Sequence, residues 1–266
     1  MRAIVRFTGP ERPWLLLVHG MLTNARHWQP NLAALAPRFN LVRIDLPGHG
    51  TSPPPADPGA LTLAALLDGI EALRAHLEIP RWFVCGQSFG AGLTLHYARR
   101  HPDRVIAQAF TNARVILRAA DNPEEAAARA RRLDLLARDG VEALRREVFH
   151  PRHARRFPPG LRAALSEDAD RIDLATYFRL IAHVGPEISL RHLPDSAPAV
   201  PTLLINGRHE RAFQPDRAAL AALWPNLVVA DLDGGHSVNI ENPDRFSAAL
   251  TGFFARAAAP VTRHIL

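Results

Sequence analysis

Short, almost uninterrupted apolar runs recur along this chain and alternate with helical patterns. Such runs are typical of strands in a parallel sheet, because helices cover both faces of that kind of sheet. We expect strands at residues 14–18, 41–44, 82–85, 105–110, 202–206 and 227–230. Helical patterns occupy residues 61–77, 89–100, 215–224 and 243–257. The alternation predicts an α/β fold with a mostly parallel, doubly wound sheet, and the alternating residues 3–7 predict an antiparallel edge strand.

The alternation is interrupted between residues 115 and 199, where a segment rich in Ala, Arg and Leu has helical periodicity and no convincing strand. We interpret this segment as a helical cap inserted after the sixth strand of the sheet. Residues 1–114 and 200–266 would then form the core, and residues 115–199 the cap. We expect cap helices at residues 124–138, 139–147, 160–168 and 173–184, with prolines marking the breaks between them.

The formal charge of +6 and the pI of about 10.9 suggest at first sight a protein that binds nucleic acid. All basic side chains other than histidine are arginines, however, and they are interspersed with acidic residues. This pattern favours ion-paired helical faces over a basic binding patch, so we expect no nucleic-acid partner. The local exception is a cluster of arginines at positions 145, 146, 152, 155 and 156, which could meet an anionic substrate or surface.

The chain has one cysteine, Cys85, so it can form no internal disulfide and offers no cysteine pattern for a metal. Cys85 falls in a predicted strand, which favours a small buried apolar side chain. No stretch is long enough to span a bilayer, and charge interrupts the first residues before a signal-peptide core develops. We therefore predict a cytoplasmic protein that needs neither a cofactor nor a metal.

The segment 83–92 runs from an apolar strand through Gly-Gln-Ser-Phe-Gly into a helix. A Gly-x-Ser-x-Gly motif in this context predicts a sharp, strained turn that exposes a nucleophilic serine, here Ser88. The amide of Phe89 would then lie at a helix N-terminus, where it can bind a developing oxyanion.

A second oxyanion donor is expected after the first long strand, in His19-Gly20-Met21. Gly20 permits a close backbone approach, and the Met21 amide could act beside that of Phe89. We interpret His19 itself as a buried, hydrogen-bonded scaffold residue.

The remaining members of a catalytic triad are sought at other strand ends, because parallel strands present their carboxyl ends at one edge of the sheet. Glu210 follows the strand at 202–206 and could hold the catalytic imidazole in the required tautomer. Asp231 or Asp233 could serve instead. His236 follows two glycines after the last apolar strand and is the candidate general base.

These motifs together make the chain resemble the α/β-hydrolase superfamily along nearly all its length. The resemblance rests on H-G, R-I-D-L-P-G-H-G, G-Q-S-F-G, N-G-R-H-E and G-G-H-S-V-N-I-E-N-P in the family's order. It implies Ser88 as nucleophile, Glu210 as acid and His236 as base, with Met21 and Phe89 in the oxyanion hole. The family usually has Asp at the acid position. The segment 45–50 resembles the family's structural turn and is not a candidate for catalysis.

The function that follows is hydrolysis of a small ester, lactone or thioester through an acyl-enzyme on Ser88. A serine nucleophile argues against relatives of the epoxide-hydrolase type, which need a carboxylate. Three alternatives use the same motifs: carbon–carbon bond hydrolysis, a biosynthetic cyclisation or release step, and a small-molecule receptor with vestigial activity. The expected partner is a small acyl substrate, and a homodimer is possible.

Substrate preference is expected to depend on the cap. We predict that its apolar side chains close a roof over Ser88, and we name Leu135, Phe149, Phe178 and Ile181 as candidates.

Overall fold

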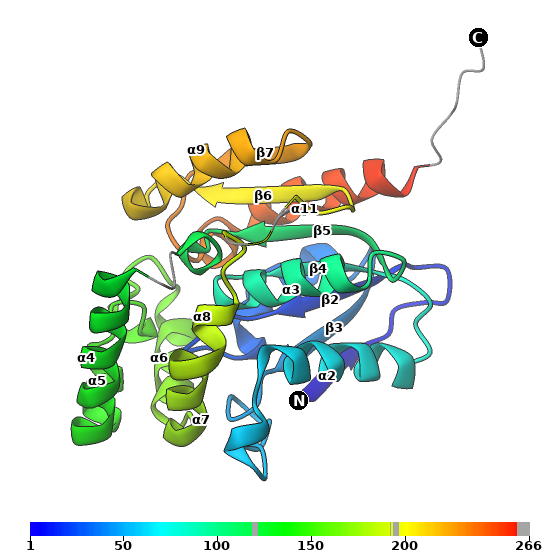
Figure 1. Ribbon diagram of the computed structural model, residues 1–266. Helices are drawn as coiled ribbons and strands as arrows, with labels where there is room; N and C mark the ends of the chain where they lie inside the picture. The colour runs from blue at the N-terminus through cyan, green and yellow to red at the C-terminus, as the bar shows by residue number, and fades with distance from the viewer. Residues whose placement is uncertain (119–121, 192, 194–196, 260–266) are drawn as a thin grey trace.

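A seven-stranded sheet with the strand order β1-β3-β2-β4-β5-β6-β7 runs through the middle of the molecule (Figure 1). The computed structural model describes residues 1–118, 122–191, 193 and 197–259. The strands are β1 (Arg2–Arg6), β2 (Trp14–Val18), β3 (Asn40–Asp45), β4 (Trp82–Gly86), β5 (Val105–Thr111), β6 (Thr202–Gly207) and β7 (Leu227–Leu232). Only β1 is antiparallel, and it pairs with β3 at one edge. The predicted fold class is confirmed.

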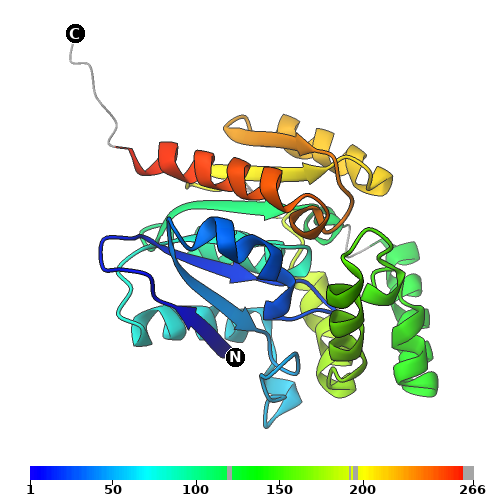
Figure 2. The ribbon, with the colours of Figure 1, turned by 180° about the vertical axis from the view of Figure 1, so that it is seen from behind.

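Side chains alternate between the two faces of the sheet, and helices bury both faces. In β2, Leu16 and Val18 join an apolar cluster with helices α2 (Leu63–His76) and α3 (Phe89–Arg100). Leu15 and Leu17 face the opposite cluster, which includes α1 (Leu32–Leu35) and α11 (Pro243–Ala258). Figures 1 and 2 show these helices on the two sides of the sheet. Helix α9 (Gln214–Leu223) packs beside β7 and adds Leu220 to the first cluster.

Between β5 and β6 the chain leaves the sheet and forms a group of helices, here named the cap helices. They are α4 (Pro123–Asp139), α5 (Val141–Arg146), α6 (Pro159–Asp170), α7 (Leu174–Arg179) and α8 (Gly185–Glu187). They lie at the end of the molecule toward which the parallel strands point (Figure 1). The expected boundaries of the cap also include residues 119–121, 192 and 194–196, which lie outside the described part of the chain.

Two expectations for this segment were wrong. The cap helices follow the fifth strand and not the sixth, because residues 1–114 contain only β1 to β5. The expected regular helix at 173–184 is α7 followed by a π-helical turn, Leu180–Val184, which leads directly into α8.

Several short elements were missed by the sequence analysis. The 3₁₀ helix η1 (Ala25–Asn31) and the helix α10 (Val238–Glu241) are too short for helical periodicity to show, and η1 contains Pro30. Further 3₁₀ turns are η2 (Pro58–Ala60), η3 (Arg114–Leu117), η4 (Pro151–His153) and η6 (Arg211–Phe213). Within the described ranges, no helix combines the length and the apolar character needed to cross a membrane.

Candidate active site

Ser88 lies in a strained turn between β4 and α3, with φ 53° and ψ −114°. Positive φ is rare for a residue with a side chain, and such strain is characteristic of functional turns. Two glycines make the turn possible. A Cβ on Gly86 would lie 2.2 Å from the carbonyl oxygen of Gly90, and one on Gly90 would lie 2.4 Å from that of Val18. The turn therefore matches the geometry expected for an exposed serine nucleophile.

Glu210 and His236 meet at the ends of β6 and β7. The Nδ1–H of His236 donates to Oε2 of Glu210 over 3.0 Å, and their side chains are 19% and 9% exposed. Burial alone would raise the pKa of Glu210, but the hydrogen bond and charge of His236 and a contact with Asn112 lower it below its ordinary value. Glu210 is thus held as a carboxylate that orients the imidazole through Nδ1. The Nε2 atom remains available to accept a proton.

Asn112 was missed by the sequence analysis although it follows β5 at the same edge of the sheet. It is fully buried, and its amide exchanges hydrogen bonds with the backbone of Gly207, 2.9 Å in each direction. These bonds hold the end of β6, from which the turn to Glu210 begins. The rule that brought Glu210 and His236 into consideration, a polar residue just beyond a buried strand, would also have found Asn112.

The alternative acids are engaged elsewhere. Asp231 accepts hydrogen bonds from Asn206 at 2.7 Å and from Arg217 at 2.7 Å. Asp233 is 67% exposed and lies 2.7 Å from the Nε2 atom of His209. Neither contacts His236 among the interactions of the described residues, so the geometry favours Glu210.

Ser88, His236 and Met21 line one narrow cavity of about 50 Å³. In the described part of the chain, neither the Met21 amide nor the Phe89 amide donates to a backbone or side-chain acceptor. The residue after Met21, Leu22, has φ 63°, and its side chain is buried among the cap helices. The expected oxyanion donors are therefore both unpaired next to the candidate nucleophile.

A second cavity, of about 150 Å³, adjoins the first and shares Thr23, Phe149, His236 and Ser237 with it. The ring of Phe149 stacks on the imidazole of His236, with centroids 4.1 Å apart and planes at 28°. Phe149 therefore forms a wall common to both cavities.

The expected apolar roof is wrong for most of its candidates. Leu135 and Phe178 are 43% and 37% exposed and do not line the cavity, and Ile181 is buried within the apolar cluster of the cap helices. Phe149 does reach the cavity. Leu136, Leu144 and Ile181 pack against one another in the apolar cluster of this segment, whereas Arg132, Glu147 and Tyr177 line the cavity.

The polar side chains in the roof are Arg132, Glu147 and Tyr177, which all line the cavity. The Arg132 guanidinium bonds to Glu147 through Nε and donates to the Tyr177 hydroxyl through Nη2 at 2.7 Å. Burial alone would lower the pKa of Arg132, but Tyr177 and Glu147 raise it above its ordinary value. The sequence analysis missed this group, whose members are far apart in the chain.

Burial keeps two histidines, His19 and His27, uncharged at neutral pH because it lowers their pKa values. His19 donates from Nδ1 to the Gly20 carbonyl at 2.7 Å and accepts the Leu46 amide at Nε2, as expected of a scaffold residue. His27 lines the cavity and contacts Asn239 Oδ1 through Nε2 at 3.0 Å. Burial lowers the pKa of each to about 3. Neither can supply a positive charge at neutral pH.

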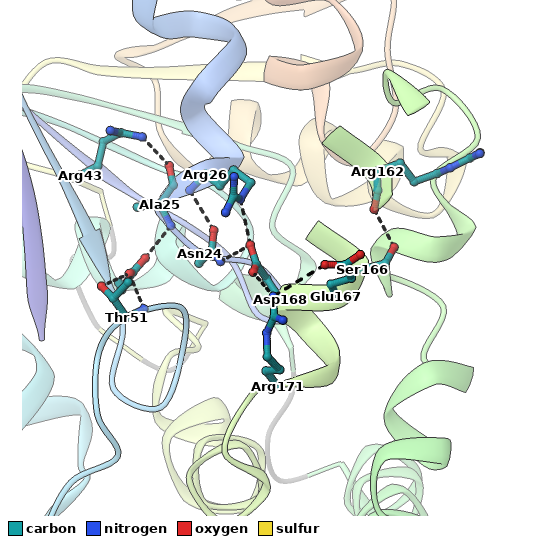
Figure 3. Close-up of polar contacts among 11 residues, drawn as sticks. Asn24, Ala25, Arg26, Arg43, Thr51, Arg162, Ser166, Glu167, Asp168 and Arg171 are labelled. Carbon is teal, nitrogen blue, oxygen red and sulfur yellow. Dashed lines mark hydrogen bonds and ion pairs between the residues drawn. The ribbon is translucent and has the colours of Figure 1, made fainter. Parts of the chain in front are cut away.

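The segment 45–50 is a structural turn, in agreement with its resemblance to the family's turn. Asp45 accepts the Ala25 amide at 2.7 Å and both the amide and hydroxyl of Thr51 at 2.8 Å. Figure 3 labels the donors Ala25 and Thr51. The carbonyl of Gly48 accepts the Asp173 amide at 3.0 Å, which ties the turn to the start of α7. Asp45 thus joins β3 to η1, and none of its side-chain hydrogen bonds to the described residues involves Ser88.

The arginine cluster is partly ion-paired. Arg145 pairs with Glu142 and Asp170, Arg146 pairs with Asp139, and Arg156 lies 3.3 Å from Glu241.

Cys85 is completely buried, and burial raises the pKa of its thiol. Across the described residues, no cluster of three or more His, Cys, Asp or Glu side chains could hold a metal ion.

Comparison with known proteins identifies the family. Residues 13–243 match the family model described as the alpha/beta hydrolase fold. A 2-succinyl-6-hydroxy-2,4-cyclohexadiene-1-carboxylate synthase from Serratia proteamaculans is 29% identical over 260 residues, which cover 91% of this chain and 93% of the relative. A putative carbamate hydrolase, RutD from Yersinia enterocolitica, is 27% identical over 258 residues, which cover 92% of this chain and 88% of the relative. Some other curated relatives match over a short segment only. A Leptolyngbya boryana protein is 42% identical over 69 residues, and a Mycobacterium tuberculosis protein is 37% identical over 94, so the match spans 22% and 27% of their lengths.

Solved structures share the fold over nearly the whole chain. MenH from S. aureus superposes with a TM-score of 0.83 at 18% identity, covering 97% of this chain and 99% of the other. The enol-lactonase from Burkholderia xenovorans LB400 superposes with a TM-score of 0.75 at 25% identity, covering 95% and 96%. With the family model matched across both halves of the sheet and the intervening helices, this chain belongs to the α/β-hydrolase family.

Proposed function

We propose that this chain hydrolyses a small ester, lactone or thioester through an acyl-enzyme on Ser88. The observation that carries the proposal is the meeting of Ser88, His236 and the Met21 amide at one cavity, with Glu210 behind His236. A strained serine, an oriented imidazole and unpaired amides are the parts that acyl transfer requires.

In the proposed reaction, Nε2 of His236 takes the proton of Ser88 as Oγ attacks the substrate carbonyl. The amides of Met21 and Phe89 stabilise the oxyanion, and Glu210 stabilises the imidazolium through Nδ1. His236 then gives the proton to the leaving alcohol, thiol or enol. Water, deprotonated by the same imidazole, attacks the acyl-enzyme and releases the acid, so that Ser88 regains its proton.

Two further parts of the proposal rest on the sequence. We propose residues 115–199 as the cap and residues 1–114 and 200–266 as the core, since the cap helices lie between β5 and β6. We also propose a cytoplasmic location, which suits a chain whose single cysteine can form no internal disulfide. The proposed partner is a small acyl compound.

A second candidate is a biosynthetic cyclisation or release step that uses Ser88, Glu210 and His236. It is favoured by one observation: the relative that aligns over 93% of its own length is named a synthase and not a hydrolase. The enol-lactonase structure, in contrast, comes from a protein named for lactone hydrolysis.

The test is covalent labelling by a fluorophosphonate together with turnover of short-chain para-nitrophenyl esters. Ser88→Ala should abolish labelling and lower kcat/KM by several orders of magnitude, because triad members act as a unit. The matched control is Ser166→Ala on α6, whose hydroxyl only donates to the Arg162 carbonyl at 2.7 Å (Figure 3).

Ester turnover by the Ser88→Ala protein at the wild-type rate would overturn the assignment. Labelling of the wild type without steady-state ester hydrolysis would favour the second candidate.

A further inference from the structure

The roof of the cavity holds an ion pair that catalysis by Ser88 does not use. Arg132 comes from α4, Glu147 follows α5, and Tyr177 lies on α7, so three cap segments bring one polar group to the cavity. Tyr177 is completely buried, and its ring lies 5.7 Å from the Arg132 guanidinium carbon. The group is built with defined geometry, because a guanidinium fixed by both a carboxylate and a phenol has little rotational freedom.

Stability is a weak explanation for this ion pair. The Arg132 and Glu147 side chains are partly buried, at 33% and 17% exposed, and pairs of this kind add little net stability because desolvation offsets much of the attraction between the charges. Leu133, Leu136 and Tyr177 already give this part of the cap apolar contacts. A polar roof over a nucleophile is better explained by what the cavity has to bind.

The free hydrogen-bonding groups define the chemistry of that ligand. Arg132 uses Nε for Glu147 and Nη2 for Tyr177, and its Nη1 has no acceptor among the described residues. Because Arg132 lines the cavity, Nη1 is the guanidinium nitrogen that is left to donate to an oxygen of a bound substrate. Because the Glu147 carboxylate balances the charge of Arg132, the roof as a whole is polar but close to neutral, and His27 beside it is uncharged.

We propose that Arg132 and Glu147 select acyl substrates carrying a second, uncharged oxygen acceptor, such as a keto or lactone oxygen, a short distance from the scissile carbonyl. An apolar chain would leave the Nη1 donor desolvated and unpaired. An anionic chain would place its carboxylate beside that of Glu147, and the neutral ion pair offers no net positive charge to offset the desolvation of that carboxylate. This inference rests on the proposed acyl-transfer function and narrows it to a substrate class.

The test compares three para-nitrophenyl esters whose acyl chains have nearly the same length: pentanoate, levulinate and hemisuccinate. Levulinate carries a ketone where hemisuccinate carries a carboxylate and pentanoate has only methylene and methyl groups. We expect kcat/KM for levulinate to exceed that for each of the others by several-fold to about tenfold, since a partly buried donor that is left unpaired costs up to about that factor.

Two variants assign the preference to the ion pair. Arg132→Met should remove the preference for levulinate over pentanoate. Glu147→Gln should leave an uncompensated guanidinium and move the preference to hemisuccinate. Because each result is a ratio of rates in one preparation, a variant that only misfolds in part lowers all three rates and leaves the ratio unchanged. Arg138→Met, on the same helix but 70% exposed and paired with Asp139, is the matched control.

A binding measurement separates this inference from the proposed function. Methyl levulinate should slow fluorophosphonate labelling of Ser88 at lower concentration than methyl pentanoate or monomethyl succinate, whether or not the esters are turned over. Equal rates and equal protection with all three chains would overturn the inference and leave the proposed function intact. A wild-type preference for hemisuccinate would also overturn it. Absence of both labelling and hydrolysis would overturn the proposed function itself.

Discussion

Glu210 differs from the acid usual at its position by one methylene, and the turn that carries it shows how the extra length is used. Its side chain is 9% exposed and reaches His236 Nδ1 over 3.0 Å from the turn after β6. Asn112 holds the start of that turn through Gly207. The Glu210 side chain therefore bridges the space between the turn after β6 and the His236 imidazole. Its length is part of the proposed triad geometry.

Glu210→Gln should lower kcat/KM by on the order of 10³–10⁴, because an amide favours the wrong imidazole tautomer and cannot stabilise the imidazolium. Glu210→Asp should lower it by on the order of a hundredfold, since the carboxylate is withdrawn by about 1 Å. Steady-state hydrolysis of a short ester measures both. Circular dichroism should show an unchanged fold.

The controls are Asp231→Asn and Asp233→Asn, which alter carboxylates bound to Asn206 and His209 and should retain most of the activity. If the Asp233→Asn protein were inactive and the Glu210→Gln protein active, the acid of the triad would be assigned to the loop after β7.

At the scale of elements, the strand–turn–helix unit around Ser88 depends on close backbone contact more than on side chains. Gly90 lies at the start of α3 against β2, and a Cβ there would be 2.4 Å from the Val18 oxygen and 2.5 Å from the His19 oxygen. Backbone atoms of a central strand cannot move away as a flexible side chain could. The position of α3 is thereby fixed relative to β2 as well as to β4.

Gly90→Ala should lower the free energy of unfolding by about 1–3 kcal/mol, the usual cost of overpacking a core, as measured by urea denaturation. Gly160→Ala is the matched control, because no atom lies within 4 Å of its added Cβ in α6. There the substitution should stabilise the protein by up to about 0.5–1 kcal/mol. A Gly90→Ala protein as stable as the wild type would show that the turn tolerates displacement.

The sheet was predictable because buried parallel strands are apolar on both faces, so that runs such as 14–18 and 82–85 need no partner to be recognised. Ser88, Glu210 and His236 could be named for a related reason: the carboxyl ends of these strands must share one edge. The group of Arg132, Glu147 and Tyr177 could not, since it depends on how α4 and α7 rotate against each other. Periodicity assigns a helix but leaves its rotation undetermined.

At the scale of the whole molecule, the cap helices are joined to the sheet by a polar contact centred on Asp168 of α6 (Figure 3). Its carboxylate accepts hydrogen bonds from Asn24 at 2.8 Å and Arg26 at 2.9 Å, next to η1, and from Arg171 at 3.0 Å. Asp168 is only 12% exposed. This contact connects the loop after Met21 to a cap helix.

Asp168→Ala should increase amide hydrogen exchange in α6 and in residues 22–31 by about tenfold, the factor that corresponds to about 1.4 kcal/mol of lost hydrogen bonding. The neighbouring Glu167→Ala is the control, because Glu167 is 71% exposed and lies 4.0 Å from Arg171. Equal exchange in the two variants would show that Asp168 does not hold α6 against residues 22–31.

The stability that the Asp168 contact contributes should also depend on pH. Burial would raise the pKa of Asp168, but the hydrogen bonds from Asn24, Arg171 and Arg26 lower it below its ordinary value. A carboxylate with a lowered pKa contributes stability above its unfolded pKa and loses it as the pH falls through the folded value. The difference between the wild type and Asp168→Ala should therefore be full at neutral pH and disappear in acid.

Leu22 gives the relation between the two parts of the molecule a further meaning. Its backbone is left-handed, with φ 63°, and its side chain is buried with Leu136, Leu144 and Ile181 of the cap helices. The conformation that leaves the preceding amide of Met21 unpaired is thus stabilised by apolar contacts with the cap. In the proposed reaction, packing of the cap helices therefore also positions the Met21 amide that stabilises the oxyanion. Removing the proposed cap would then remove the support for a proposed oxyanion donor as well as part of the cavity lining, and we expect the sheet alone to be inactive.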